Sequence, residues 1–252
     1  MKKWRLLLCC LLLLILNFSR TAIPVQSQDA PPSSTLQARR QELADRIAER
    51  EGLLIGGDAL ALVHVRNRIT ELELQLFDFD AALAESQASI EIARQFAGTA
   101  TATVLADTLN LAADARIRHD DNEAALTLLN EALTLSHDLG YQRGEAQAHT
   151  LLGAAQFELN NGRASADNYN QALQIWRDLN DQRGQAQTLA GRGLNYLLDD
   201  NAVEATAALQ SAEAIWRSLN DHTELATTLL HEGALAMRLG QWQSALAALS
   251  EA

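Results

Sequence analysis

The chain of 252 residues is 48% hydrophobic but only 5% aromatic, and it carries a net charge of −12. Its apolar residues are mainly Ala and Leu, which favour helices, so the composition argues against a β-sandwich and a collagen-like chain. Both cysteines and all three prolines lie within the first 32 residues, which excludes a disulfide scaffold and a cysteine-ligated metal site in the rest.

Residues 1–27 have the pattern of a secretory signal peptide. Lys2, Lys3 and Arg5 precede an uninterrupted apolar run over residues 6–16. A helix that spans a bilayer needs about 20 apolar residues, so this run is too short to span. Val25 and Ser27 stand at the two positions that a signal peptidase reads. We therefore expect cleavage after Ser27 and export to the periplasm or the extracellular space.

Two alternatives stay open for this leader. The first is a lipid anchor at Cys9 or Cys10, although both cysteines lie among leucines and lack the small residues of a lipobox. The second is an uncleaved membrane anchor, because Asn17 and Arg20 end the apolar run sharply.

Removal of the leader would leave an acidic chain without cysteine or lysine. Its sixteen basic residues are all arginines and face 32 acidic residues, which gives a net charge of −16. Such a charge argues against binding nucleic acid or an anionic membrane, since both require neutralisation of negative groups. The absence of cysteine excludes thiol catalysis in this mature chain. Residues 28–34, with Pro31 and Pro32, are predicted to form a short disordered linker.

A repeat of forty residues dominates the remaining sequence. The segment that begins at Ala172, ALQIWRDLND, recurs at Ala212 as AEAIWRSLND, and the same shift relates Gly153 to Gly193 and Gly233. A looser copy lies forty residues before Ala172, and a weaker one lies 43 residues before that copy. Residues 98–103 are small and polar, so we expect the three extra residues to lengthen a loop there.

Within each unit the apolar spacing of three and four residues predicts two amphipathic helices. Asp, Asn and Gly residues separate the helices of each pair. Between pairs, Gly140, Asn180 and Asn220 are residue types that tolerate the left-handed position after a helix. Asp181 and Asp221 then suit the N-cap of the following helix. The sequence thus predicts helix hairpins from end to end.

These units resemble tetratricopeptide repeats (TPR). Small residues recur where that family brings its two helices close together, and large residues fill the gaps around them. The small residues are Gly153, Ser165 and Ala172; Gly193, Ala205 and Ala212; Gly233, Ala245 and Ala252; and Ala113, Ala125 and Ala132. The forty-residue period is similar to kinesin-light-chain-like repeats, which in bacteria often precede a caspase-like CHAT domain. The resemblance implies an all-α, right-handed superhelical solenoid of antiparallel helix hairpins.

The predicted organisation places a capping helix at residues 35–57 ahead of a repeat array at 58–252. Its units are a divergent 58–97, then 101–140, 144–180, 184–220 and an incomplete 224–252. In the first unit Thr70 replaces the landmark glycine and Ser86 replaces a large residue, as in an atypical end repeat. The last unit stops part-way through its second helix, from which we expect a longer parent protein.

Known catalytic patterns are absent from the sequence. The six histidines form no metal pair at helical spacing, and no phosphate-binding glycine loop or G-x-S-x-G motif occurs. Gly191 and Gly193 are expected to be packing sites inside a helix, and Trp176 and Trp216 to pack between hairpins. We therefore predict no enzymatic activity, no metal, no cofactor and no small-molecule substrate.

The remaining candidate site is the groove that the first helix of each hairpin lines in TPR proteins. The resemblance carries the groove positions onto His64, Asn67, Glu71 and Gln75; Asp107, Asn110, Asp114 and Arg118; Gln147, Thr150 and Glu158; Gln187 and Leu194; and Thr227 and Leu230. Acidic residues occupy the first half and more apolar ones the second, which favours a peptide or protein partner with a basic stretch. The sequence predicts an exported interaction scaffold, with the sensing segment of a larger CHAT-type peptidase as the alternative.

Overall fold

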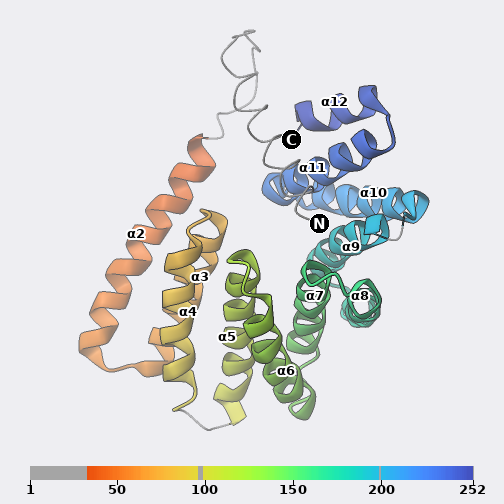
Figure 1. The fold of residues 1–252 in the computed structure, drawn as a ribbon. Coiled ribbons are helices and arrows are strands. Elements are labelled where there is room, and N and C mark those ends of the chain that lie inside the picture. Colours follow the sequence, from red (N-terminus) through yellow and green to blue (C-terminus); the bar gives the residue numbers. More distant parts are fainter. Residues whose placement is uncertain (1–32, 96–98, 199, 252) are drawn as a thin grey trace. The chain divides into compact units, whose positions relative to one another are not determined.

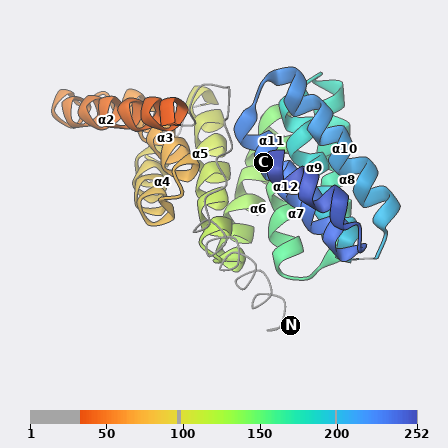
Figure 2. The same cartoon turned by 90° about the horizontal axis from the view of Figure 1, so that it is seen from above.

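The structure is a computed structural model that describes residues 33–95, 99–198 and 200–251. The predicted signal peptide and nearly all of the predicted linker lie outside the described residues. Residues Ala38–Ala252 form one compact unit. Within the described residues every regular element is a helix, and Figures 1 and 2 show the helices following one another as hairpins in chain order. None of the described helices is both long and apolar enough to cross a membrane.

Among the described residues, five antiparallel hairpins follow helix α2 (Ser33–Gly56). We call the first helix of each hairpin the A helix and the second the B helix. The A helices are α3 (Ala59–Gln75), α5 (Thr99–Arg118), α7 (Gln142–Glu158), α9 (Gln182–Leu198) and α11 (His222–Arg238). The B helices are α4 (Phe79–Ala93), α6 (Asn122–Asp138), α8 (Gly162–Asp178), α10 (Ala202–Leu219) and α12 (Trp242–Glu251).

The A helices form the inner layer of the array. Each B helix packs on the A helix of its own hairpin. The B helices α4, α6, α8 and α10 also pack on the A helix of the following hairpin. Successive A helices also pack on one another, whereas the backbones of successive B helices do not approach closely among the described residues, and α10 meets α12 through the Arg217–Glu251 ion pair. Closer approach on the A side curves a stack toward that side, so the A helices line its concave face. The described chain is therefore an all-α solenoid of antiparallel hairpins, as predicted.

The predicted helix ends are confirmed. Gly140, Asn180 and Asn220 have φ values of 62°, 53° and 54°, in the left-handed region. The carboxylate of Asp181 accepts a hydrogen bond from the backbone N–H of Gly184 at 3.0 Å. Asp221 accepts one from Glu224 in the same way. These local rules place the hairpin boundaries.

The lengthened loop expected at residues 98–103 is wrong. Helix α5 begins at Thr99 and has 20 residues, whereas α7, α9 and α11 have 17 each. The three extra residues therefore extend a helix. Alternating Thr and Ala after Gly98 contain no helix breaker, so an added turn at the N-terminus of α5 meets no local obstacle.

Small residues permit the close approach of the two helices in a hairpin. A Cβ atom added at Gly153 would lie 2.6 Å from the ring of Tyr169, and one at Gly193 would lie 2.8 Å from Leu209. Gly233 stands equally close to Leu249. The predicted packing role of the landmark glycines is thus confirmed.

Trp176 and Trp216 are buried, with 2% and 1% of their surface exposed, which confirms their predicted packing role. Trp216 lies among Leu173 of α8, residues of α9 and Ala212 of α10. The indole N–H of Trp176 donates to Thr150 Oγ1 at 3.1 Å. The Trp216 N–H has no partner, because the residue forty positions after Thr150 is Ala190.

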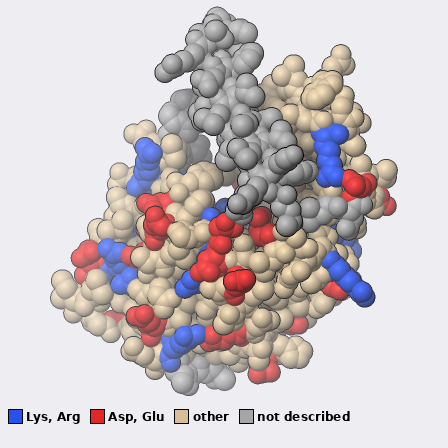
Figure 3. All heavy atoms as spheres, in the orientation of Figure 1, with Lys and Arg blue, Asp and Glu red and all other residues tan. Residues whose placement is uncertain are grey.

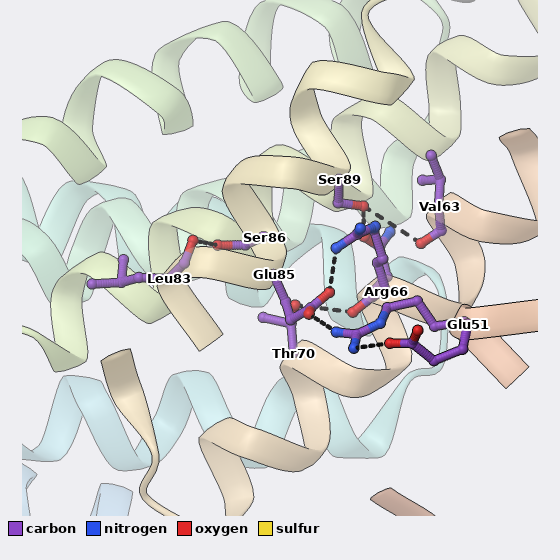
Figure 4. A network of polar contacts seen from close by, with 10 residues as sticks. Glu51, Val63, Arg66, Thr70, Leu83, Glu85, Ser86 and Ser89 are labelled. Atoms are coloured by element: carbon purple, nitrogen blue, oxygen red, sulfur yellow. Dashed lines mark hydrogen bonds and ion pairs between the residues drawn. The ribbon is translucent and has the colours of Figure 1, made fainter. Parts of the chain in front are cut away.

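Helix α2 lies where the capping helix is predicted, and charged groups hold it to the first hairpin. The carboxylate of Glu85 on α4 pairs with Arg50 of α2 and Arg66 of α3, and Figure 4 shows Arg66 and Glu85 pointing toward one another. Arg68 of α3 donates to Glu42 of α2 at 2.8 Å. None of the side chains described in α2 is fully buried.

Candidate functional site

The predicted groove residues all lie on A helices, and they divide by exposure. His64, Asp107, Arg118, Glu158, Thr227 and Leu230 are exposed, and Gln75 is exposed as well. Asn67, Glu71, Asp114, Gln147, Gln187 and Leu194 are half-buried, and Asn110 and Thr150 are buried. The structure therefore leaves most of this set within reach of a ligand.

The two buried members connect successive A helices. The amide of Asn110 donates to the carbonyl of Gly144 on α7 at 3.0 Å. Thr150 Oγ1 lies 2.9 Å from Thr188 Oγ1 on α9 and also receives the Trp176 N–H. These two side chains are engaged between repeats, so their structural role is to fix the spacing of the inner layer.

Asn67 has a similar linking role at the start of the array. Its amide donates to Thr108 Oγ1 of α5 at 2.8 Å, and its carbonyl oxygen accepts from Ser89 of α4 at 2.6 Å. One half-buried amide therefore ties together α3, α4 and α5.

Asp107 combines exposure with desolvation. Its carboxylate is exposed and accepts a hydrogen bond from the Tyr141 hydroxyl at 2.9 Å. Desolvation by the surrounding protein nevertheless raises the pKa of Asp107, and the Tyr141 hydrogen bond opposes that rise. The pKa of Tyr141 rises to about 12, first through desolvation and then through the Asp107 charge.

Asp114, Arg118 and Glu224 form a second charged group on the concave face. Arg118 Nε donates to Asp114 at 2.9 Å within α5. The Asp114 charge is the main reason that the pKa of Arg118 is raised, and Glu224 of α11 adds to it. The pKa of Glu224 is raised by desolvation first and then by the nearby Asp221 charge, while Arg118 opposes the rise. The directions of these pKa shifts indicate that Arg118 of the second hairpin and Glu224 of the fifth lie near enough to influence each other.

Sequence reasoning missed Glu224 as a groove residue. It stands forty positions after Gly184 and eighty after Gly144, where glycine allows close packing. The available signal in the sequence was a carboxylate at a position where the two preceding repeats both have glycine. Its proximity to Arg118 depends on the curvature of the whole array, which no short sequence pattern carries.

Sequence reasoning also missed a ladder of ion pairs along the N-terminal ends of the A helices. Arg143 pairs with Asp181 at 2.7 Å, and Arg183 pairs with Asp221 at 2.5 Å. The guanidinium of Arg143 lies 5.9 Å from the ring centre of Trp176, and that of Arg183 lies 5.6 Å from Trp216. The forty-residue spacing of these Arg and Asp residues was the signal.

The surface hollows lie elsewhere. One of about 460 Å³ is lined by Gln156, by Asn161 to Ala164 and by Asp167 at the start of α8. Another of about 500 Å³ lies between Leu105 of α5 and residues of α6. No predicted groove residue lines either hollow, and both are shallow and open. Within the described ranges, no three His, Cys, Asp or Glu side chains are placed to hold a metal ion.

Charged side chains are unevenly distributed on the molecular surface. Figure 3 shows acidic side chains gathered toward the middle of the face seen in that orientation, with arginines interspersed. The stack of antiparallel helix hairpins defines the fold as a helical-repeat solenoid of the TPR-like type.

No protein-family model matches the sequence, and no curated protein is similar to it. Solved structures do share its fold. BtubC (BKLC) from P. vanneervenii superposes with a TM-score of 0.59 at 18% identity, over 88% of this chain and 89% of that one. A Rap protein complexed with Competence and Sporulation Factor has a TM-score of 0.69 at 14% identity, over 86% and 69%. The Rap conjugation gene regulator of plasmid pLS20, in complex with the Phr* peptide, has a TM-score of 0.63 at 10% identity, over 91% and 67%.

Proposed function

We propose that this protein is an exported interaction scaffold that binds a peptide or a partner protein on the concave face of its A helices. The observation that carries the proposal is the inner layer of stacked A helices, on which exposed and half-buried polar side chains such as Asp107 and Glu224 stand one after another. Charged groups held partly dehydrated on a concave face interact strongly with a ligand that brings opposite charge. One similar solved structure is named as a complex with the Phr* peptide and another as a complex with Competence and Sporulation Factor, which supports a binding role.

The distribution of residues along the face favours a partner with a basic stretch next to apolar side chains. Glu71, Asp107 and Asp114 occupy α3 and α5. Leu194 and Leu230 stand at the groove positions of α9 and α11, and Leu230 is 49% exposed. An extended or helical segment along the face would therefore meet carboxylates first and apolar contacts afterwards.

The same composition favours a protein ligand over other classes. The net charge of −12 opposes nucleic acid, whose phosphates need cationic partners. The proposed activity is recognition without catalysis, without a cofactor and without a small-molecule substrate. Its repeats are of the forty-residue, kinesin-light-chain-like variety.

The test is selection of peptides from a random phage-displayed library by the chain from Gln28 onward. Fluorescence anisotropy then measures the affinity of the selected peptides. We expect selected sequences with Lys or Arg beside apolar residues. Reversing Glu71, Asp107 and Asp114 to Arg should weaken binding at least about tenfold, because three attractive charges become repulsive.

The matched control reverses three exposed acids of the B helices, Glu123, Asp167 and Glu204. This variant changes the net charge by the same amount but leaves the concave face intact, so it should bind the selected peptides normally. Selection of acidic peptides, or equal weakening by both triple variants, would show that the concave face is not the site.

Export and the larger parent protein stay predictions. The signal peptide predicted at residues 1–27 lies outside the described residues. The alternative, that the array is the sensing segment of a CHAT-type peptidase, is tested by the genomic sequence after codon 252. A downstream His and Cys pair in a caspase-like domain would support that alternative, and a stop codon would contradict it.

A further inference from the structure

Helix α2 faces the repeat array along one side only. Between residues 39 and 50 its half-buried side chains recur at steps of three and four, and the side chains between them are exposed, so the half-buried ones form one stripe along the helix. The stripe consists of Arg39, Glu42, Leu43, Arg46, Ile47 and Arg50. Four of these six side chains are charged, and charged groups return to water more readily than apolar ones.

The backbone of α2 does not come close to that of any other described helix. Each of the other described helices packs closely on at least one neighbour. Contacts of α2 with the array are therefore made by side chains. Elements with few close contacts open locally more readily than the packed core of a protein. Helix α2 is thus attached to the array without being packed into it.

The polar contacts of the stripe reach both the first and the fifth hairpin. Glu42 accepts two hydrogen bonds from the guanidinium of Arg68 on α3, at 2.8 and 3.1 Å. Arg39 donates to Thr223 Oγ1 on α11 at 2.8 Å. Figure 2 shows the N-terminal end of α2 directed toward α11. One helix therefore bridges the first and the last described A helices.

Both contacts lie on the groove-lining side of these A helices. Arg68 stands four residues after His64 and three before Glu71, with which it also pairs at 2.8 Å. Thr223 stands four residues before Thr227. Residues three and four apart share one side of a helix, so α2 touches the side that carries the predicted groove positions. It occupies space there that a ligand on the same side would need.

The repeat register shows what Arg39 contributes at α11. Arg143 and Arg183 stand at the position of Thr223 in the two preceding repeats, and both belong to the ladder of ion pairs described above. The fifth A helix has threonine in place of this arginine. The guanidinium of Arg39 reaches that position from α2, so α2 brings a cation to the place where the repeat itself has none.

We propose that α2 is a detachable strap on the concave face. In the docked state it bridges the groove-lining sides of α3 and α11, and in the released state it leaves both of them to a ligand. Its arginines alternate with Leu and Ile residues, the combination proposed above for the ligand, so α2 and the ligand compete for the same surface. The competition rests on the proposed function, whereas the docking and release of α2 do not.

The test measures the distance between α2 and α11 in the chain from Gln28 onward, which contains no cysteine. Nitroxide labels at Ala38→Cys and His222→Cys, both exposed positions, report this distance by double electron-electron resonance. We expect a short and narrow distance distribution. The release variant combines Arg39→Ala with Glu42→Arg, which removes the hydrogen bond to Thr223 and places a positive charge beside Arg68. Its distribution should become longer and broader.

The matched control combines Arg40→Ala with Asp45→Arg. It changes the net charge by the same amount on the exposed side of α2, so it should keep the wild-type distance distribution. Circular dichroism checks that all three forms have the same helix content. A wild-type distribution as broad as that of the release variant, or equal broadening by the control, would overturn the strap.

The affinity for the library-selected peptides tests the competition. The wild-type chain binds through the fraction of molecules in which α2 is released, so the release variant should bind more tightly by the inverse of that fraction, about tenfold where a tenth of the molecules are released. The distance distribution measures the same fraction independently. An unchanged affinity despite a released α2 would overturn the competition. If neither form binds any peptide, the proposed function is contradicted, and the distance distributions alone decide whether α2 is a strap.

Discussion

The substitution Gly153→Ala tests whether close packing of each hairpin depends on a glycine opposite a large residue. Tyr169, 2% exposed, lies between two glycines of neighbouring repeats. A Cβ at Gly153 would lie 2.6 Å from its ring carbons, and one at Gly191 would lie 2.5 Å from its hydroxyl. Burial also raises the pKa of Tyr169. The ring therefore has little freedom to move away.

Two effects of opposite sign decide the magnitude. Replacing glycine with alanine inside a helix favours folding by about 1 kcal/mol through backbone entropy. Forcing a methyl group against a fixed ring costs about 1–3 kcal/mol through overpacking. Because the contact is with the ring carbons and not a flexible end, we expect the upper part of that range. The net result is a loss of about 1–2 kcal/mol in the free energy of unfolding.

Urea unfolding of the chain from Gln28, followed by circular dichroism, measures this loss. Repeat arrays can depart from two-state behaviour, so midpoint and slope are compared together. The control Gly52→Ala in α2 has nothing within 4 Å of the added Cβ and should be neutral or stabilising. In a Tyr169→Leu background, which imitates the natural pair of Ala113 and Leu129, Gly153→Ala should lose most of its cost. Equal stabilisation by Gly153→Ala and Gly52→Ala would refute the packing argument.

Two further predictions concern buried polar groups. The buried carbonyl oxygen of Asn110 lacks a partner because Ala132 stands where Ser89 donates to Asn67 in the previous repeat. Ala132→Ser should therefore raise the free energy of unfolding by about 0.5–1 kcal/mol, measured as a higher urea midpoint. Burial raises the pKa of Glu73 to about 7, against an ordinary value of 4.5. The folded state therefore holds this proton more tightly, and the free energy of unfolding falls as pH rises from about 4.5 to about 7. Glu73→Gln should flatten that fall, and a pH dependence of the urea midpoint equal to that of the wild type would contradict this assignment.

Local features of this fold follow from the sequence because they depend on neighbouring residues. Asn180 and Asn220 take the left-handed position, and Asp181 and Asp221 cap the next helices, as residue type alone predicts. Phe77 is the exception, since its φ of 62° belongs to a position where the other repeats have Asp, Asn or Gly. A side chain of that size has no local preference for this conformation, so the surrounding helix packing holds it there.

Features that depend on the path of the chain through several repeats could not be predicted. Whether Glu224 of the fifth hairpin acts on Arg118 of the second is decided by small rotations accumulated over three repeats. The extra turn at the start of α5 was not predicted, because small polar residues suit the start of a helix as well as a loop. The family resemblance predicted that the groove residues lie on the inner side of the array. The structure was needed to show that Asn110 and Thr150 are buried while other groove positions are exposed.

Comparison of equivalent positions separates what stacking requires from what the concave face presents. Buried packing positions keep their character across repeats, as Gly153, Gly193 and Gly233 do. The equivalent A-helix positions that reach solvent are less uniform: they are Asp107, Gln147, Gln187 and Thr227, a carboxylate, two amides and a hydroxyl. Stacking of identical units would permit identical residues at these positions, so packing does not account for their variety. Such variation along the array is what the proposed binding of an extended ligand requires, because successive ligand residues would then meet different side chains.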